Sequence, residues 1–269
     1  MNKSLRDLMH KGLITCPPET SLGNVAMLLT QHHIHALVVV ENNKPLGIIS
    51  DFDLLAGEWL SVDAESLDTM RRMTARDLMT YPIATIESNI SAEAAAQQMI
   101  EKQVHRMIVI ENGEPAGVIS ISNFVASIAE QEPVKRQTVG DVMSETFLVC
   151  REETSVLSAA RTMTQAGWRS IVVVNATGKL LGFITGRDLM HLAGRNVDEK
   201  LKVSQCMNRS LLTVDINASL QEAADLMIQN HRHRVVVIDT NDPDSFPLGV
   251  LSSFDIVAEM ARPGSIWQS

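Results

Sequence analysis

The sequence has few of the features that mark membrane, secreted or nucleic-acid-binding proteins. Its 269 residues include three cysteines and 4% aromatic residues, and the formal net charge is −9. The longest apolar runs are far shorter than the ~20 residues that would cross a bilayer. Residues 1–15 contain no signal-peptide core. General nucleic-acid binding requires a basic surface, which an acidic chain lacks. We therefore expect a soluble cytoplasmic protein.

The cysteines and the common catalytic motifs give no sign of a metal centre or of an enzyme. Cys16, Cys150 and Cys206 are widely separated and show no C-x-x-C spacing, so neither a disulfide framework nor a zinc site is indicated. The chain has no P-loop, no dinucleotide-binding glycine motif, no nucleophile elbow and no His-Glu-x-x-His. Repeats occupy nearly the whole chain and leave no room for a catalytic domain, so we expect no enzymatic activity.

What the sequence does contain is one motif in four copies. The motif is a glycine, two apolar residues, a serine or threonine, two variable residues, an aspartate or asparagine, and an apolar residue. Its copies begin, at similar intervals along the chain, at Gly47, Gly117, Gly182 and Gly249. A motif that recurs in this way indicates four tandem repeats of about 60 residues each.

The four repeats have the same predicted order of elements. A short segment ending in methionine comes first, followed by a serine N-cap and an amphipathic helix. A β-branched run then reads as a strand, and a turn leads to a second strand that carries the glycine motif and starts another helix. The predicted fold class is therefore α/β (α+β), with four β-α-β-β-α repeats. Because such a small sheet cannot bury its apolar face alone, we expect two pairs of repeats.

The turn and linker composition predicts where the repeats begin and end. Residues 57–73, which include Trp59 and Leu60, are predicted to form a helical connector, and residues 263–269 a tail. The repeats themselves are predicted to span residues 1–56, 74–132, 133–195 and 196–262.

The repeated motif permits two interpretations from its residues alone. A serine or threonine three residues before an acid is a capping-box pattern, so the motif could simply start helices. Alternatively, the free amides of a helix N-terminus attract phosphate, and a carboxylate there can accept hydrogen bonds from ribose hydroxyls. The residue pairs concerned are Ser50 and Asp53, Thr185 and Asp188, and Ser252 and Asp255.

A phosphate also needs a cation, which directs attention to the residues just before the first long strand of each repeat. An arginine there could hold two phosphate oxygens through parallel donors. The four dipeptides are His35-Ala36, His105-Arg106, Trp168-Arg169 and His233-Arg234. The first of them contains no arginine.

Together, the fourfold motif, the openings such as Asp7-Leu8-Met9 and the His-Arg strand starts resemble cystathionine-β-synthase (CBS) domains. The arrangement resembles two tandem pairs of the kind called Bateman modules. The resemblance implies a pseudo-twofold pair in each half of the chain, with two clefts between its members. Members of this family bind AMP, ADP, ATP and related adenosyl ligands there, as in the gamma subunit of AMP-activated protein kinase. The resemblance also implies that the motif aspartate holds the ribose and a basic pair from the partner repeat the phosphate.

Applied to this chain, the resemblance implies three complete nucleotide sites and one incomplete site. The complete sets are Ser50 and Asp53 with His105 and Arg106, Thr185 and Asp188 with His233 and Arg234, and Ser252 and Asp255 with Trp168 and Arg169. The fourth set joins Asn123 to His35 and Ala36 and is predicted to be weak or empty. Thr213 is a further predicted contact, whereas Val149 replaces the equivalent threonine and puts one cleft of the second half in question.

The predicted function is regulation by an adenine nucleotide, with no obligatory cofactor and no bound metal. The main site is expected in the second module, because most of the excess acidic residues lie in the first half. Ligand binding would change module packing and so act on an unidentified partner protein. We expect a homodimer and neither a nucleic-acid nor a membrane partner. Two alternatives stay open: a ligand-free interaction scaffold, and a metal-responsive module that uses the histidines clustered at 32–35 and 231–233.

Overall fold

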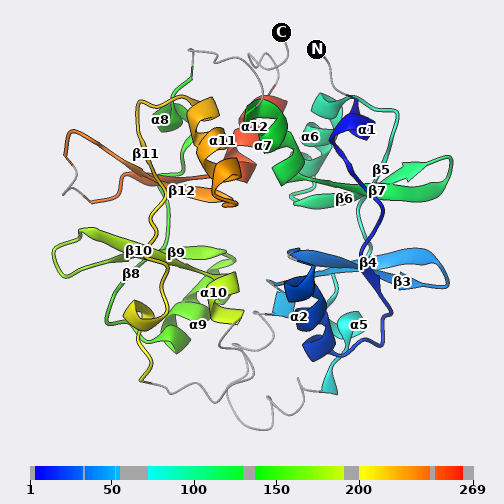
Figure 1. Ribbon diagram of the computed structural model, residues 1–269, viewed down its shortest axis with the longest axis horizontal. Coiled ribbons are helices and arrows are strands. Elements are labelled where there is room, and N and C mark those ends of the chain that lie inside the picture. Colours follow the sequence, from blue (N-terminus) through cyan, green and yellow to red (C-terminus); the bar gives the residue numbers. More distant parts are fainter. Residues whose placement is uncertain are drawn as a thin grey trace. The chain divides into compact units, whose positions relative to one another are not determined.

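A computed structural model describes residues 4–32, 34–51, 53–54, 72–129, 137–190, 200–242 and 246–262. The predicted connector lies almost entirely outside these ranges, and the predicted tail lies wholly outside them. Within them, short helices alternate with small mixed sheets, which confirms the predicted α/β class (Figure 1). None of the described helices is long and apolar enough to cross a membrane.

Each repeat contains a short strand, an amphipathic helix and two longer strands, and a closing helix follows in repeats 2, 3 and 4. Repeat 1 contains β2 (Thr15–Cys16), α2 (Leu22–Gln31), β3 (Ala36–Glu41) and β4 (Lys44–Ser50). Repeat 2 contains β5 (Thr85–Glu87), α6 (Ala92–Glu101), β6 (Arg106–Glu111), β7 (Glu114–Ser120) and α7 (Ile121–Ala129). Repeat 3 contains β8 (Val149–Arg151), α9 (Val156–Ala166), β9 (Ser170–Val174), β10 (Leu180–Thr185) and α10 (Gly186–Met190). Repeat 4 contains β11 (Thr213–Asp215), α11 (Leu220–Gln229), β12 (Arg234–Ile238), β13 (Gly249–Ser252) and α12 (Ser253–Ala261).

The amphipathic helices begin where their serines predicted. Each N-cap hydroxyl accepts a hydrogen bond from the backbone N–H three residues later, which satisfies one donor that the helix leaves free. The four N-caps are Ser21, Ser91, Ser155 and Ser219. In α9 the buried positions Val156, Ala159, Ala160 and Met163 recur at helical spacing. The helices therefore turn one apolar face toward the sheet.

The two longer strands of each repeat are antiparallel, and the short strand runs parallel beside the first of them. In repeat 2, β6 pairs with β7 so that Arg106 lies opposite Ser120, and β5 pairs with β6. In repeat 4, the same register places Arg234 opposite Ser252. The start of the first long strand thus lies beside the hydroxyl residue of the motif.

The segments that end in methionine pack on the other repeat of their pair. In the first half, β1 (His10–Lys11), which follows α1 (Leu5–Leu8), pairs with β7 of repeat 2. The segment after α5 (Ala75–Leu78) returns to repeat 1, where Thr80 bridges Ile48 of β4. In the second half, α8 (Val139–Val142) contacts α12, and η1 (Val203–Gln205) adds Val203 to the core of repeat 3. The openings are therefore exchanged within each half.

The motif glycine explains how closely the exchanged segments approach. A Cβ atom at Gly47 would lie 2.9 Å from the Thr80 carbonyl oxygen, and one at Gly249 would lie 2.8 Å from the Ser144 carbonyl oxygen. Real Cβ atoms do not come this close to backbone oxygens, so a residue without a side chain is required at these positions.

The chain divides into two compact units. The first unit comprises residues 1–12, 84–147 and 211–269 and contains repeats 2 and 4. The second comprises residues 13–83 and 148–210 and contains repeats 1 and 3. In the first unit, α6 and α7 pack against α11 and α12 (Figure 1), and one core cluster includes Phe124 of repeat 2 and Val257 of repeat 4. Among the described residues of the second unit, repeats 1 and 3 have separate core clusters.

Candidate functional site

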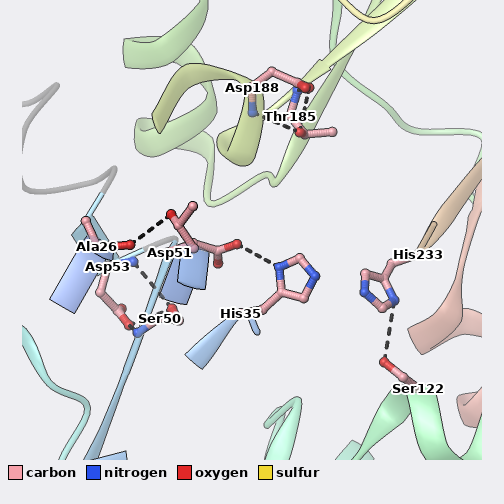
Figure 2. Close-up of polar contacts among 10 residues, drawn as sticks. Ala26, His35, Ser50, Asp51, Asp53, Ser122, Thr185, Asp188 and His233 are labelled. Atoms are coloured by element: carbon pink, nitrogen blue, oxygen red, sulfur yellow. Dashed lines mark hydrogen bonds and ion pairs between the residues drawn. The ribbon is translucent and has the colours of Figure 1, made fainter. Parts of the chain in front are cut away.

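The motif acids form capping boxes at the ends of the second long strands. Asp53 Oδ2 accepts hydrogen bonds from the Ser50 backbone N–H at 2.7 Å and from the Ser50 hydroxyl at 2.6 Å (Figure 2). Asp188 Oδ2 accepts the same two bonds from Thr185, at 2.8 and 2.6 Å (Figure 2). The capping interpretation of the motif therefore describes a real contact.

Repeats 4 and 2 show the same geometry with different chemistry. Asp255 Oδ2 accepts bonds from Ser252 at 2.7 and 2.6 Å. In repeat 2, Asn123 Oδ1 accepts them from Ser120 at 2.9 and 2.7 Å. The asparagine thus serves the helix as well as an aspartate does, so the cap alone does not explain why the other three repeats carry a charge.

The cap engages one of the two carboxylate oxygens of each motif aspartate. In the described part of the chain, no hydrogen bond reaches Oδ1 of Asp53, Asp188 or Asp255. A carboxylate oxygen in that position can accept a hydrogen bond from a sugar hydroxyl. The corresponding atom of Asn123 is an amide nitrogen, which only donates. The capping and ligand-binding interpretations are therefore compatible in three repeats, and the acceptor is lost in the fourth.

Asp53 has an environment that opposes its charge. Burial raises the pKa of this carboxyl group above its ordinary value, while the hydrogen bonds from Ser50 and the positive charge of Arg169 act in the opposite direction. Arg169 belongs to repeat 3 and Asp53 to repeat 1, and both lie in the second unit. A cation of one repeat therefore acts on the motif acid of another.

The sheet register defines which strand-start residues are equivalent. Arg106 lies opposite Ser120, and Arg234 lies opposite Ser252, but the residue opposite Thr185 is Ser170. Ser170 is therefore the structural equivalent of Arg106 and Arg234, and Arg169 is the equivalent of the histidines that precede those arginines. The sequence had instead suggested that Arg169 is equivalent to the arginines. The carbonyl oxygen at this position accepts a hydrogen bond from the first residue after the second long strand, in the pairs His35 and Asp51, His105 and Ile121, Arg169 and Gly186, and His233 and Ser253.

A constant feature of the sequence identifies the same equivalence. His35, His105, Arg169 and His233 each stand the same number of residues after the N-cap serine of their repeat. Grouping Trp168-Arg169 with the His-Arg dipeptides matched the arginines by residue type and not by this spacing. The helix cap therefore supplies a better reference point than the residue type.

In the first unit, the strand starts and motifs of repeats 2 and 4 contact each other reciprocally. Ser122 Oγ in repeat 2 lies 3.5 Å from His233 Nδ1 in repeat 4 (Figure 2). The ring of His105 in repeat 2 lies 5.2 Å, between centroids, from the ring of Phe254 in repeat 4. The backbone carbonyl of each histidine also accepts a hydrogen bond from the N–H of the first residue of the closing helix in its own repeat. The two histidines therefore lie beside the N-termini of α7 and α12.

Each of these histidines begins a basic dipeptide. Arg106 and Arg234 directly follow the two histidines and begin β6 and β12. Helix N-termini carry partial positive charge, and arginine is the side chain best suited to phosphate. The first unit thus places His105 and His233 beside the N-termini of the two closing helices, and each histidine is directly followed by an arginine.

The equivalent histidine of repeat 1 has a different partner. His35 Nδ1 lies 2.9 Å from Asp51 Oδ2 within the same repeat (Figure 2). The next residue is Ala36, which lies opposite Ser50 and supplies no cation. Repeat 1 therefore contributes an acid but no guanidinium, as the sequence indicated.

Each predicted nucleotide set takes its acid from one unit and its basic pair from the other. Asp53 lies in the second unit, whereas His105 and Arg106 lie in the first, and the same division holds for the remaining sets. These combinations of residues from the two units stay predictions. Thr213 and Val149 begin β11 and β8, and 38% of Val149 is exposed.

Two features bear on the other chemistry considered from the sequence. Among the described residues, no three His, Cys, Asp or Glu side chains form a group that could hold a metal ion. Cys150 and Cys206, which the sequence gave no reason to pair, both pack against the core of repeat 3.

Comparison with known proteins identifies the family. The CBS domain matches residues 5–58, 75–130, 139–195 and 203–262. The chain belongs to the CBS-domain family. The four matched segments correspond to the four repeats, and together they account for most of the chain.

Several proteins are similar to this chain over much of its length. An uncharacterized protein of Methanocaldococcus jannaschii is 28% identical over 192 residues, which are 70% of this chain and 44% of that protein. A second one from the same organism is 23% identical over 86% of this chain and 90% of its own length. Pig 5′-AMP-activated protein kinase subunit gamma-3 is 22% identical over 73% of this chain and 41% of its own. The chain therefore spans less than half of two of these relatives.

The fold is also found in solved structures. A crystal structure of an M. jannaschii protein, proposed to be an archaeal homologue of the kinase gamma subunit, superposes with a TM-score of 0.83 at 19% identity. The superposition covers 95% of this chain and 99% of the M. jannaschii chain. An uncharacterized protein of Pyrococcus horikoshii gives a TM-score of 0.68 at 18% identity. At these identities the likeness concerns the fold alone.

Proposed function

We propose that this protein is a non-catalytic regulator that binds adenine nucleotides such as AMP, ADP or ATP. The observation that carries the proposal is that Asp53, Asp188 and Asp255 cap their helices through Oδ2 and leave Oδ1 for a ligand. A nucleoside fits this chemistry, because its ribose offers two hydroxyl donors to a carboxylate. The similarity to a kinase subunit named for AMP supports the same ligand class.

The basic residues indicate how the phosphates would be held. His105 and His233 lie beside two helix N-termini in the first unit, where amide donors favour an anion, and Arg106 and Arg234 follow them directly in the sequence. Phosphates directed toward this cluster would be bound by residues of both repeat 2 and repeat 4. The second module, with Asp188 and Asp255, is the proposed main site.

The same arrangement suggests how binding would be transmitted. A ligand can shift the equilibrium between two arrangements of the repeats only if it binds one of them more tightly. A phosphate shared by His-Arg pairs from repeats 2 and 4 meets this condition, because its contacts depend on the packing of α7 against α11 and α12. We propose that this change acts on a partner protein and that the regulator is a homodimer.

Calorimetry with AMP, ADP and ATP on Asp188→Asn and Asp255→Asn tests the ligand proposal. Each substitution keeps a cap of the kind seen at Asn123 and removes an acceptor. A hydrogen bond to a charged group contributes about 1.5–3 kcal/mol, so affinity should fall about 10- to 100-fold. Asp141→Asn is a matched control, because Asp141 forms the same box with Thr138, at 2.8 and 2.9 Å, outside the motif.

The control variant also separates the scaffold alternative. If the motif acids only cap helices, all three substitutions should change stability alike, by at most ~1 kcal/mol, and none should change ligand affinity. No heat of binding with any adenine nucleotide at millimolar concentration would rule out the nucleotide proposal.

A further inference from the structure

Two cysteines far apart in the sequence lie on neighbouring segments at the core of repeat 3. Cys150 is the middle residue of β8, and Cys206 directly follows η1 in the exchanged opening. Val203 N–H donates to the Thr154 carbonyl at 2.8 Å, and Ser204 N–H donates to the Glu152 carbonyl at 3.1 Å. Each cysteine stands two residues beyond the Ser204–Glu152 pair, on the same side of it. Both side chains are partly buried against one core cluster.

The other repeats show what these two positions normally do. The residue before each opening methionine belongs to one core cluster with the second residue of a short strand, namely the short strand of the repeat on which that opening packs. The corresponding pairs are Leu78 and Cys16 in repeat 1, Leu8 and Ile86 in repeat 2, and Val142 and Val214 in repeat 4. In repeats 1, 2 and 4 at least one of the two positions therefore carries a hydrocarbon side chain, whereas in repeat 3 both positions carry a thiol.

The electrostatics of the thiols agree with this placement. Burial raises the pKa of Cys150 to about 11, and the neighbouring Cys206 contributes to the increase. Burial also raises the pKa of Cys206 to about 11, with a further contribution from the negative charge of Asp188. Cys206 therefore lies within electrostatic range of both Cys150 and the motif acid of repeat 3.

We propose that Cys150 and Cys206 form a reversible disulfide that fastens the exchanged opening of repeat 4 to β8 of repeat 3. The oxidant would be a small disulfide such as oxidised glutathione. The thiolate of one cysteine attacks the glutathione disulfide, forms a mixed disulfide and releases one glutathione thiolate. The thiolate of the other cysteine then displaces the second glutathione. Two protein thiols are oxidised, one disulfide oxidant is reduced to two thiols, and the two cysteine protons go to these products or to solvent.

The location connects the disulfide with the ligand site. Beyond Cys206, Asn208 N–H donates to the Phe183 carbonyl at 2.9 Å, and Phe183 N–H donates to Asn208 at 3.1 Å. Phe183 lies in β10, which leads directly to Thr185 and the Asp188 cap. A covalent bond at Cys206 would constrain the segment that lies along this strand. On the proposed function, which this step requires, oxidation changes nucleotide affinity at the Asp188 site.

The test is to equilibrate the full-length chain with oxidised glutathione at mildly alkaline pH and to count thiols by mass spectrometry of its peptides. We expect Cys150 and Cys206 to be lost together in one cross-linked peptide pair, while Cys16 stays reduced. Because both thiols have raised pKa values, the rate should increase with pH up to about 11.

Residues taken from the other repeats provide the controls. Cys150→Val and Cys206→Val introduce the residues that repeat 4 carries at these positions, and each should abolish the cross-link. Cys16→Ile, which introduces the residue of repeat 2, should leave it intact. Wild-type protein that keeps both thiols, or that acquires only glutathione adducts, would overturn the proposal.

Nucleotide calorimetry on the oxidised and reduced protein is a separate measurement. A cross-link without a change in affinity would overturn the connection to Asp188 and leave the disulfide established. Absence of nucleotide binding in both states would refute the proposed function but not the cross-link, since the peptide measurement requires no ligand.

Discussion

The two compact units are built from the same repeats, and the described residues show a different contact between the repeats in each of them. In the first unit, repeats 2 and 4 share one core cluster, and four helices form their contact. Among the described residues of the second unit, the cores of repeats 1 and 3 are separate, and the contact between the repeats that can be assigned is the charge of Arg169 acting on Asp53. Repeats with the same order of elements thus show an apolar connection in one unit and an electrostatic one among the described residues of the other. We therefore expect a loss of packing in the first unit to spread between repeats 2 and 4 through their shared core cluster.

Core truncation should give the largest effect in this comparison. Phe124→Ala removes a fully buried ring from the shared cluster and should lower the free energy of unfolding by about 3–5 kcal/mol. Met163→Ala, in the separate core of repeat 3, should cost about 2–5 kcal/mol. Hydrogen exchange distinguishes them. Phe124→Ala should reduce protection in α7 and also in α11 and α12 of repeat 4, whereas Met163→Ala should reduce it mainly in α9 and β9. If the loss of protection reached the neighbouring repeat equally in both variants, the units would not differ in this respect.

Glycine substitutions should have an intermediate effect. A Cβ atom at Gly182 would lie 2.5 Å from the Asn208 carbonyl oxygen, so Gly182→Ala must displace the exchanged segment and should cost about 1–3 kcal/mol. Gly23→Ala is the matched control, because nothing lies within 4 Å of its Cβ position inside α2. That variant should gain about 0.5–1 kcal/mol in stability. Urea unfolding measures both, and a similar loss in the two variants would contradict the exchanged packing.

The smallest expected effect concerns pH. Since burial raises the folded-state pKa of Asp53, this group contributes stability below its unfolded pKa, and that contribution is lost as pH rises through the folded value. Arg169→Ala should raise the pKa of Asp53 further and move this loss to higher pH. Asp53→Asn should remove it. Unfolding midpoints between pH about 3 and about 7 measure the effect, and the same profile in wild type and Arg169→Ala would show that Arg169 does not act on Asp53.

Much of the fold was accessible from the sequence because it depends on local chemistry. Ser91 begins α6 because its hydroxyl satisfies a free amide, and the β-branched run before Glu111 forms β6 because it suits a buried strand. The caps of Asp53, Asp188 and Asp255 were likewise predicted from their spacing. The residue types alone were enough to predict a carboxylate in three copies of the motif and an uncharged amide, at Asn123, in the fourth.

The rest depended on contacts between distant segments. Nothing local indicates that Leu5 packs with repeat 2 instead of repeat 1, because both cores offer an apolar surface. The proximity of Cys150 and Cys206 follows from the same exchange and was missed for this reason. The position of Arg169 could have been predicted, since the N-cap serine gives a fixed reference, but the strand register was needed to show that residue type was the wrong guide.

The exchanged openings determine the smallest piece of this chain that can fold. Val203 and Leu5 are fully buried, yet each belongs to a segment that precedes a different repeat from the one whose core it completes. A repeat cut out at its sequence boundaries would lack the opening segment that completes its core. It would carry instead the opening that completes the core of its neighbour. Growth or shortening of such a protein by whole repeats must therefore proceed two at a time, and an odd number would leave one core open to solvent.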